Sequence, residues 1–301
     1  MSGTKRELTF ALVQRNFPCA FQEADDNPTL VYERLLSGAV LFSPDVVVLP
    51  ESAYCEYGAF GSKYAESFSS WLLKYAGAKV VIGGGTRTED GELYNSAALY
   101  SAVGGPDRAL DVQYYDKVHL VPFGEYIPGD KLIPALKKFA PVGSCSSGKA
   151  KLLTYGDINL AVAICYEDTD SAHVRTLARM GADVLVFITN DSWFSYSDEA
   201  VQHAWQAVSR ALETGLPVVR VGNSGVTGVI SPNGEAKWLL SKSGNILLDS
   251  PGCKIERVAV TAEKKMTPYA VVGDWPVATA FAIVVLIIFF PWRLVKKTEQ
   301  L

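Results

Sequence analysis

The chain has 301 residues, of which 49% are hydrophobic, and its formal net charge is −4. This composition is typical of a globular protein with a substantial core, and without a basic excess it excludes a nucleic-acid-binding role. The five cysteines (Cys19, Cys55, Cys145, Cys165 and Cys253) form neither a disulfide framework nor a CxxC zinc pattern. At least one thiol is therefore expected to be free.

Hydrophobic periodicity predicts alternating strands and helices followed by hairpins, which indicates one α/β domain with a mixed sheet covered by helices. The strands are predicted at 8–13, 45–49, 79–83, 94–100, 110–115, 161–164, 182–188, 218–221 and 226–230. The helices are predicted at 29–41, 68–76, 171–180 and 198–214. We expect 94–100 and 110–115 to pair antiparallel across a turn at 104–106, and the long irregular stretch 117–148 to be functional.

The helix predicted at 198–214 is strongly amphipathic. The side chains expected on its buried face are those of Val201, Ala204, Trp205, Val208, Ala211 and Leu212. Gly215 is expected to end this helix.

The C-terminal segment from Trp275 to Trp292 contains no charged residue. Its 18 residues approach the length of about 20 needed to cross a bilayer as a helix, with a tryptophan at each end and basic residues directly after it. We therefore predict a domain at 1–270, a transmembrane helix at 271–292 and a basic cytoplasmic tail at 293–301. The alternative is a buried C-terminal helix.

The apolar run Ala161–Ile164 predicts a buried strand that ends at Cys165, shortly before a helix. A thiol in this position would lie at the mouth of an α/β sheet, where helix amides and a nearby cation would lower its pKa. The alternative is a core cysteine, because free cysteine is among the most buried residue types.

Two other polar residues lie where strands end or long loops begin. Glu51 follows the strand at 45–49, and Lys117 follows the strand at 110–115. A carboxylate can take the thiol proton as a general base, and an ammonium can stabilise a thiolate and an oxyanion. The simpler explanations are a helix cap for Glu51 and a surface charge for Lys117.

Three segments resemble the motifs of the nitrilase, or carbon–nitrogen hydrolase, superfamily. They are Leu49-Pro50-Glu51-Ser52-Ala53, the stretch Lys117 to Pro128, and Ile164-Cys165-Tyr166-Glu167. Within this superfamily the chain resembles the apolipoprotein N-acyltransferases. That closer likeness also includes Asn190 to Phe194, Gln202-His203, Arg210 to Glu213, Asn223 to Thr227, Thr267-Pro268-Tyr269 and Gly273 to Pro276.

The resemblance implies a four-layer α-β-β-α sandwich followed by one transmembrane helix, and a Glu51–Lys117–Cys165 triad. Cys165 would take an acyl chain from a phospholipid as a thioester and pass it to the α-amino group of a diacylglyceryl-modified lipoprotein cysteine. The same match implies that Glu125 supports the base or the lysine.

By the same resemblance, Tyr166 and Glu167 shape the site, the backbone N–H of Tyr166 faces the oxyanion, and neither metal nor cofactor is needed. Trp193 is a candidate contact for the acyl chain, although an aromatic residue after a strand more often serves packing. A histidine–cysteine pair using His119 or His203 is a weaker alternative.

The sequence departs from this family because several membrane helices precede the domain in the acyltransferases. We therefore expect a split or truncated form, with a separate membrane subunit supplying those helices. The C-terminal basic residues favour the bacterial inner membrane, with the domain on the periplasmic side. The alternatives are a membrane-anchored amidase acting on a small C–N substrate and a non-enzymatic scaffold.

Overall fold

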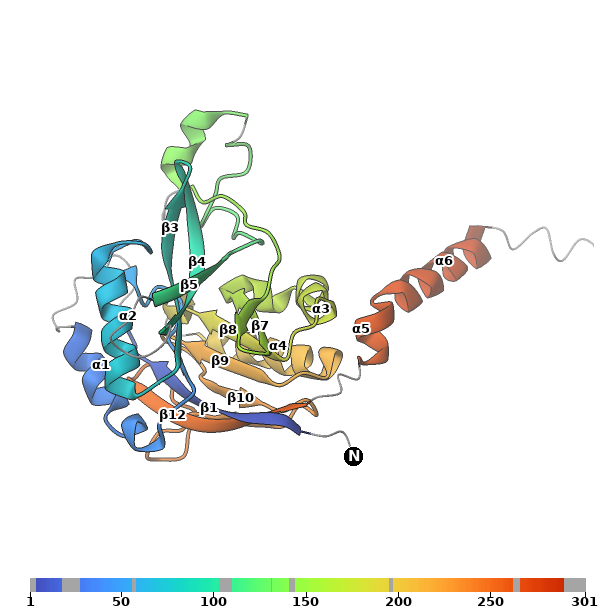
Figure 1. Ribbon diagram of the computed structural model, residues 1–301. Coiled ribbons are helices and arrows are strands. Elements are labelled where there is room, and N and C mark those ends of the chain that lie inside the picture. The colour runs from blue at the N-terminus through green and yellow to red at the C-terminus, as the bar shows by residue number, and fades with distance from the viewer. Residues whose placement is uncertain are drawn as a thin grey trace, which may run out of the picture.

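Two six-stranded β-sheets pack face to face, with helices on their outer faces, in the computed structural model (Figure 1). The structure describes residues 4–17, 28–55, 58–102, 110–130, 132–140, 144–194, 197–261 and 266–289. The order of layers is helix, sheet, sheet, helix, because one apolar cluster lies between the sheets and two others lie under the helices. This arrangement confirms the predicted four-layer α-β-β-α sandwich.

The first sheet has the order β12-β1-β2-β3-β4-β5, and parallel pairing is confined to its β1-β2 and β2-β3 neighbours. Its strands are β1 (Thr4–Gln14), β2 (Val46–Val48), β3 (Val80–Glu89), β4 (Glu92–Ala102), β5 (Leu110–Asp116) and β12 (Gly252–Thr261). Helices α1 (Pro28–Leu36) and α2 (Lys63–Ala76) cover its outer face.

The second sheet has the order β11-β10-β9-β8-β7-β6, with β7, β8 and β9 parallel. Its strands are β6 (Leu153–Tyr155), β7 (Ile158–Ile164), β8 (Val184–Thr189), β9 (Val218–Gly222), β10 (Gly228–Ile230) and β11 (Ala236–Trp238). Helices α3 (Ser171–Arg179) and α4 (Glu199–Thr214) cover its outer face.

The central strands are apolar on both faces because each lies between the opposite sheet and a layer of helices. In β7, for example, Val162 and Ile164 pack between the sheets, whereas Ala161 and Ala163 pack under the helices. Each fully buried valine or isoleucine contributes about 1.5–3 kcal/mol to folding. This packing positions the carboxyl ends of β2, β7 and β8, after which Glu51, Cys165 and Asn190 follow.

Several predicted elements differ from the observed ones. The helix predicted at 29–41 is divided into α1 and a 3-10 helix, Ala39–Phe42, and α2 begins at Lys63 rather than at 68. The antiparallel pairing of β4 with β5 is confirmed, whereas the turn predicted at 104–106 lies outside the described residues. Strands β6, β11 and β12 were not predicted.

The amphipathic face predicted for α4 is partly wrong. Trp205 and Leu212 are exposed, whereas the polar residues His203 and Arg210 are buried with the alanines. The predicted end of the helix is confirmed, because Gly215 has a positive φ of 71° and donates its N–H to the Ala211 carbonyl.

The C-terminal part of the described chain consists of α5 (Pro268–Val272) and α6 (Trp275–Phe289). Helix α6 projects away from the sandwich and buries none of its side chains (Figure 1). Among the described residues, no helix has both the length and the apolar character required to cross a bilayer. The predicted span 271–292 is therefore not confirmed, and 290–301 lies outside the described residues.

Candidate active site

The loop after β2 presses Glu51 onto the neighbouring strand β3. Gly84 of β3 donates its N–H to the Pro50 carbonyl at 3.1 Å. A Cβ atom on Gly84 would lie only 2.6 Å from the Cα of Glu51, so this close approach requires glycine. The loop turns at Ser52, whose φ is 63°, and the Glu51 side chain is buried. Burial, the largest cause, raises the pKa of Glu51, although the Lys117 charge opposes this shift.

Lys117 follows the last residue of β5, and its side chain is only 1% exposed. Its Nζ donates to Glu125 Oε1 at 3.0 Å and lies 4.0 Å from Glu51 Oε1. Burial by itself disfavours the ammonium, but the interactions with the Glu51 and Glu125 carboxylates favour it. The pKa of Lys117 is therefore held above its ordinary value, so this buried lysine remains charged at neutral pH.

Asn95 links the two carboxylates, and we did not predict its role. Its Nδ2 donates to Glu51 Oε1 at 2.8 Å and to Glu125 Oε1 at 2.6 Å. The other Glu125 oxygen accepts the Val121 N–H at 2.8 Å. A signal existed in the sequence, because Asn95 shares its strand face with buried Ala97 and Leu99, where a polar side chain requires a partner.

Cys165 is the first residue of a 3-10 helix, Cys165–Thr169, directly after β7. Its φ of 52° is rare for a residue with a side chain, and such backbone strain clusters at functional sites. The residue is partly exposed and packs against the core between the sheets. Its thiol lies within electrostatic range of Glu51 and Lys117, so the three predicted residues converge in one place.

The expected lowering of the Cys165 pKa is wrong. Burial is the largest cause, and with the nearby Glu51 carboxylate it raises the pKa of the Cys165 thiol above its ordinary value. Lys117 lowers this pKa without outweighing both effects. The sulfur is therefore a thiol in the unliganded site.

Glu167 connects the 3-10 helix Cys165–Thr169 (the cysteine turn) to the residues directly after Lys117. Its Oε1 accepts the N–H groups of Val118 at 2.6 Å and His119 at 3.1 Å, and its Oε2 accepts that of Ile164 at 2.8 Å. Burial raises the pKa of Glu167 to about 7, against these hydrogen bonds. This carboxyl therefore fixes the position of the segment next to Lys117.

Tyr166 and Trp193 are both about half exposed. Tyr166 belongs to the cysteine turn, and Trp193 to the 3-10 helix Asp191–Phe194 that follows β8. Both side chains are therefore accessible to a ligand that approaches along the loops after β7 and β8.

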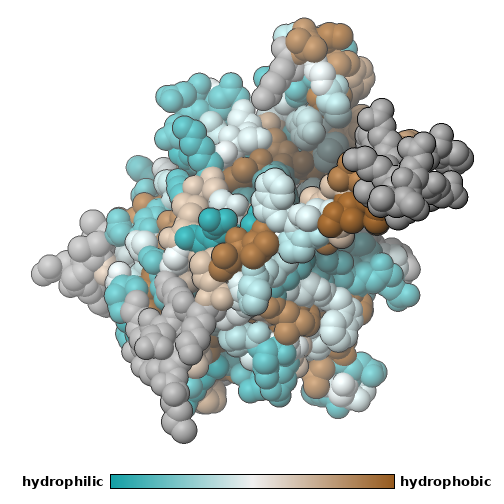
Figure 2. All heavy atoms as spheres, turned by 90° about the vertical axis from the view of Figure 1, so that its right-hand side faces the viewer, coloured by the Kyte–Doolittle hydropathy of each residue, from teal (hydrophilic) through white to brown (hydrophobic). Residues whose placement is uncertain are grey.

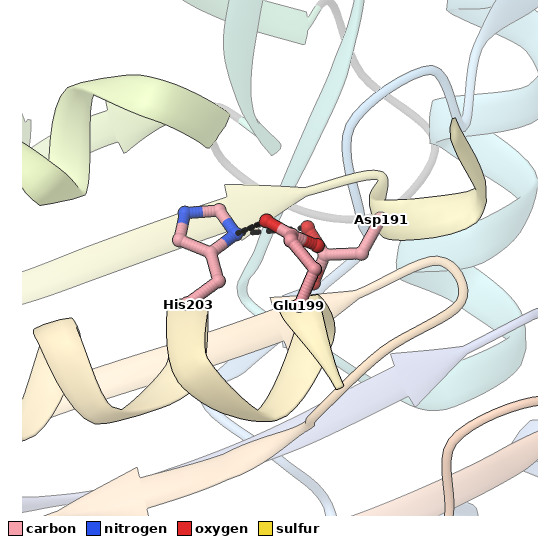
Figure 3. Close-up of side chains that lie close together, drawn as sticks. All are labelled: Asp191, Glu199 and His203. Carbon is pink, nitrogen blue, oxygen red and sulfur yellow. Dashed lines mark hydrogen bonds and ion pairs between the residues drawn. The ribbon is translucent and has the colours of Figure 1, made fainter. Parts of the chain in front are cut away.

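Asp191, Glu199 and His203 place a nitrogen and two carboxylate oxygens within 4.8 Å of one another (Figure 3). His203 Nδ1 lies 2.9 Å from Asp191 Oδ1, and its Nε2 lies 2.7 Å from Asp168 Oδ1. Burial and Arg220 disfavour the imidazolium, but Asp168 and Asp191 outweigh them and raise the pKa of His203 to about 9. A protonated imidazole offers no lone pair to a metal ion or to the Cys165 proton.

His119 is likewise engaged away from the sulfur. Its Nδ1 lies 3.3 Å from Asp170 Oδ2, and its ring contacts that of His173. These contacts, together with those of His203, give no support to a histidine–cysteine pair.

Residues 13–245 match the model of the carbon-nitrogen hydrolase family. The chain belongs to the carbon–nitrogen hydrolase family. It is 30% identical over 280 residues to the apolipoprotein N-acyltransferase of Photobacterium profundum, an alignment that covers 90% of this chain and 52% of the relative. It is 35% identical to the apolipoprotein N-acyltransferase of Geobacter metallireducens, over 73% of this chain and 42% of the relative.

These two alignments show that this carbon–nitrogen hydrolase chain spans about half the length of the curated relatives it matches. The resemblance to the acyltransferase branch is therefore confirmed by curated relatives that carry that name.

Solved structures support the same fold. A carbon-nitrogen hydrolase from Helicobacter pylori G27 superposes with a TM-score of 0.60 at 15% identity, covering 83% of this chain and 88% of that one. A variant of the amidase from Nesterenkonia sp. AN1, of the nitrilase superfamily, gives a TM-score of 0.60 at 16% identity, covering 87% and 94% of the two chains. The predicted nitrilase-like sandwich is thereby confirmed.

Proposed function

We propose that this carbon–nitrogen hydrolase chain transfers an acyl group from a phospholipid to the N-terminal cysteine of a lipoprotein. The observation that carries the proposal is the convergence of Glu51, Lys117 and Cys165 in a chain whose curated relatives are named apolipoprotein N-acyltransferases. The three residues come from loops after β2, β5 and β7, and strand ends of α/β sheets are where ligands bind.

In the proposed first half-reaction, Glu51 takes the Cys165 proton as the sulfur attacks the acyl ester carbon of the phospholipid. The buried, charged Lys117 stabilises the thiolate and then the tetrahedral oxyanion, together with the backbone N–H of Tyr166. The ester C–O bond breaks, the proton passes from Glu51 to the leaving alkoxide, and a thioester remains on Cys165.

In the second half-reaction, the α-amino group of a diacylglyceryl-modified cysteine attacks the thioester. The C–N bond forms as the C–S bond breaks, and Glu51 removes the amine proton and returns it to the sulfur. Glu125 holds Lys117 in place throughout, since its two oxygens are fixed by Lys117, Asn95 and Val121. The exposed rings of Tyr166 and Trp193 would contact the acyl chain.

Helix α6 would hold the active face at a bilayer. Its exposed side chains include Trp275, Val277 and Phe281, and no residue of the helix is buried. Figure 2 views the molecule from the side toward which α6 projects, where the hydrophobic surface lies in separate patches among hydrophilic atoms. Helix α5 connects α6 to α3, because Tyr269 donates to the Ser171 hydroxyl at 3.1 Å. Since Ser171 begins the helix directly after the cysteine turn, an anchor at α6 would bring that turn close to lipid.

We place the protein at the bacterial inner membrane, anchored by a C-terminal span over 271–292 and with the domain on the periplasmic side. The curated relatives are about twice as long as the matched region.

The second candidate function is hydrolysis of a small amide, because a structurally similar protein is an amidase. The same thioester would form, and water rather than an amine would resolve it. The exposed apolar side chains of α6 favour the lipid substrate.

Intact mass spectrometry after incubation with phospholipid vesicles tests the proposal. The expected result is a long-chain acyl adduct on Cys165 that is absent from Cys165→Ser and that a diacylglyceryl-cysteine peptide removes. Turnover of a small amide without any lipid adduct would establish the amidase instead.

A further inference from the structure

Four buried charged side chains form a closed ring beside the cysteine turn. Asp168, the fourth residue of that turn, contacts His203 through Oδ1 at 2.7 Å and Arg220 through Oδ2. Asp191 contacts the same two cations, His203 through Oδ1 at 2.9 Å and Arg220 through Oδ2 at 3.3 Å. Each carboxylate therefore bridges both cations, and the two negative charges balance the two positive ones.

The ring joins four segments that surround the nucleophile. Asp168 belongs to the Cys165–Thr169 helix, His203 to α4 and Arg220 to β9, whereas Asp191 follows β8. Arg220 is fully buried, with an exposed fraction of 0%. Because a buried charge without its partner is costly, this closed arrangement fixes the cysteine turn relative to the end of β8.

Thr189 connects the ring to the reacting sulfur. It is the last residue of β8, and the parallel register that pairs Ile164 with Ile188 places it next to Cys165. Its hydroxyl donates to Asp191 Oδ1 at 2.7 Å and also lies within hydrogen-bonding reach of the Cys165 sulfur. One hydroxyl has one proton, so it can donate either to Asp191 or to a thiolate at any moment.

We propose that Thr189 is a further catalytic residue, which turns its hydroxyl proton from Asp191 to the Cys165 sulfur when the thiolate forms. The inference rests on the proposed function, because it concerns the same nucleophile. The S–H bond breaks as Glu51 takes the proton, and the Thr189 O–H bond only rotates. Asp191 stays paired during this change because the ring still supplies His203 and Arg220.

The thiol lies within electrostatic range of Glu51 and Lys117 and also of Asp191 and Arg220. The triad removes the proton. The ring provides, through Thr189, the hydrogen bond that a thiolate needs in a buried site. His203 is a positioning residue in this scheme, since it acts on the sulfur through Asp191 and Thr189.

The test is the alkylation rate of Cys165 by iodoacetamide between pH 6 and pH 10, followed by peptide mass spectrometry in the full chain. Thr189→Val keeps the shape but removes the hydroxyl, and we expect a higher apparent thiol pKa and about tenfold slower alkylation at neutral pH. Thr189→Ser should react within about twofold of the unmodified chain. Thr176→Val, at an exposed threonine of α3, is the matched control and should change nothing.

Equal alkylation rates for Thr189→Val and the unmodified chain would overturn the proposal. Should that variant fold poorly by circular dichroism, Thr189→Ala gives the same comparison. His203→Gln should also raise the apparent thiol pKa, because Asp191 then keeps a negative charge without its imidazolium. The alkylation assay needs no phospholipid, so it is independent of the acyl-transfer assay. If Thr189→Val slows alkylation but the unmodified chain forms no acyl adduct, only the proposed function is refuted.

Discussion

Lys117 donates a 3.0 Å hydrogen bond to Glu125, and the two side chains are almost completely buried. Glu51 lies farther from the ammonium, at 4.0 Å. The difference suits the two tasks proposed for these carboxylates, in which the closer one holds the lysine and the farther one exchanges a proton. Glu125 also accepts the Asn95 amide and the Val121 N–H, which leaves it little capacity to act as a base.

The substitution Glu125→Gln should therefore weaken both folding and activity. The buried lysine would keep only Glu51, its more distant partner, as a charged neighbour, and we expect a loss of about 1–3 kcal/mol in the free energy of unfolding. The rate of Cys165 acylation should fall about 100-fold because the lysine is no longer fixed. Urea denaturation and a single-turnover acylation assay measure the two effects. Glu235→Gln, at an exposed position, is the control, and equal behaviour of the two variants would contradict the role given to Glu125.

Asn95→Ala should shift the pH dependence of the reaction. The Asn95 amide lowers the pKa of Glu51 against the stronger effect of burial, so its removal raises that pKa further. A base with a higher pKa is protonated over a wider range, and the acidic limb of the acylation profile should move to higher pH. At neutral pH the rate should fall about tenfold. Asn245→Ala, at an exposed asparagine, should leave the profile in place, and an unmoved limb in Asn95→Ala would refute the coupling.

The buried parallel strands could be predicted because each lies between two apolar layers. The runs at Val46–Val48 and at 161–164 therefore carry apolar residues on both faces. Glu51, Lys117 and Cys165 could be proposed from their positions directly after strands. Strand β12 escaped prediction because its pairing partner is β1, more than 230 residues away along the chain, and because only Val258 and Val260 of its residues are buried.

The polar residues inside strands could not be assigned roles from the sequence. Asn95 and Arg220 acquire their partners from strands and loops that are distant in the sequence. Thr189 bonds to Asp191, only two residues later, but its position next to Cys165 depends on the pairing of β8 with β7. The direction of the Cys165 pKa shift was wrong for a related reason. It depends on how many atoms surround the sulfur and on the Glu51 carboxylate, neither of which a linear pattern contains.

A charge placed on α6 should weaken membrane association without changing the site. Phe281 is 70% exposed, and Phe281→Lys would bring an ammonium into contact with hydrocarbon if the helix inserts. We expect the bound fraction in vesicle flotation to fall severalfold, with unchanged iodoacetamide reactivity at Cys165. Leu41→Lys, at a residue of the sandwich that is 84% exposed, is the control. Equal flotation of Phe281→Lys and the unmodified chain would remove the case for an α6 anchor.

The two buried histidines should act on stability in opposite pH ranges. The pKa of His203 is raised to about 9, so the folded state binds more protons than the unfolded state above pH ~6.5, and stability should fall as pH rises toward 9. Burial lowers the pKa of His173 to about 4, so stability should fall as pH decreases from ~6.5 to 4. For the well-buried His203, the pKa shift corresponds to about 3 kcal/mol in the free energy of unfolding.

Urea denaturation at closely spaced pH values separates the two histidines. His203→Gln should remove the alkaline loss of stability and keep the acidic one, whereas His173→Gln should do the reverse. The expected reason is the difference in environment. His203 is paired with the carboxylates of Asp168 and Asp191. Among the described residues, the ring of His173 has one hydrogen bond, with the Tyr115 hydroxyl. An alkaline loss that persists unchanged in His203→Gln would show that the ring with Arg220 does not depend on the imidazolium.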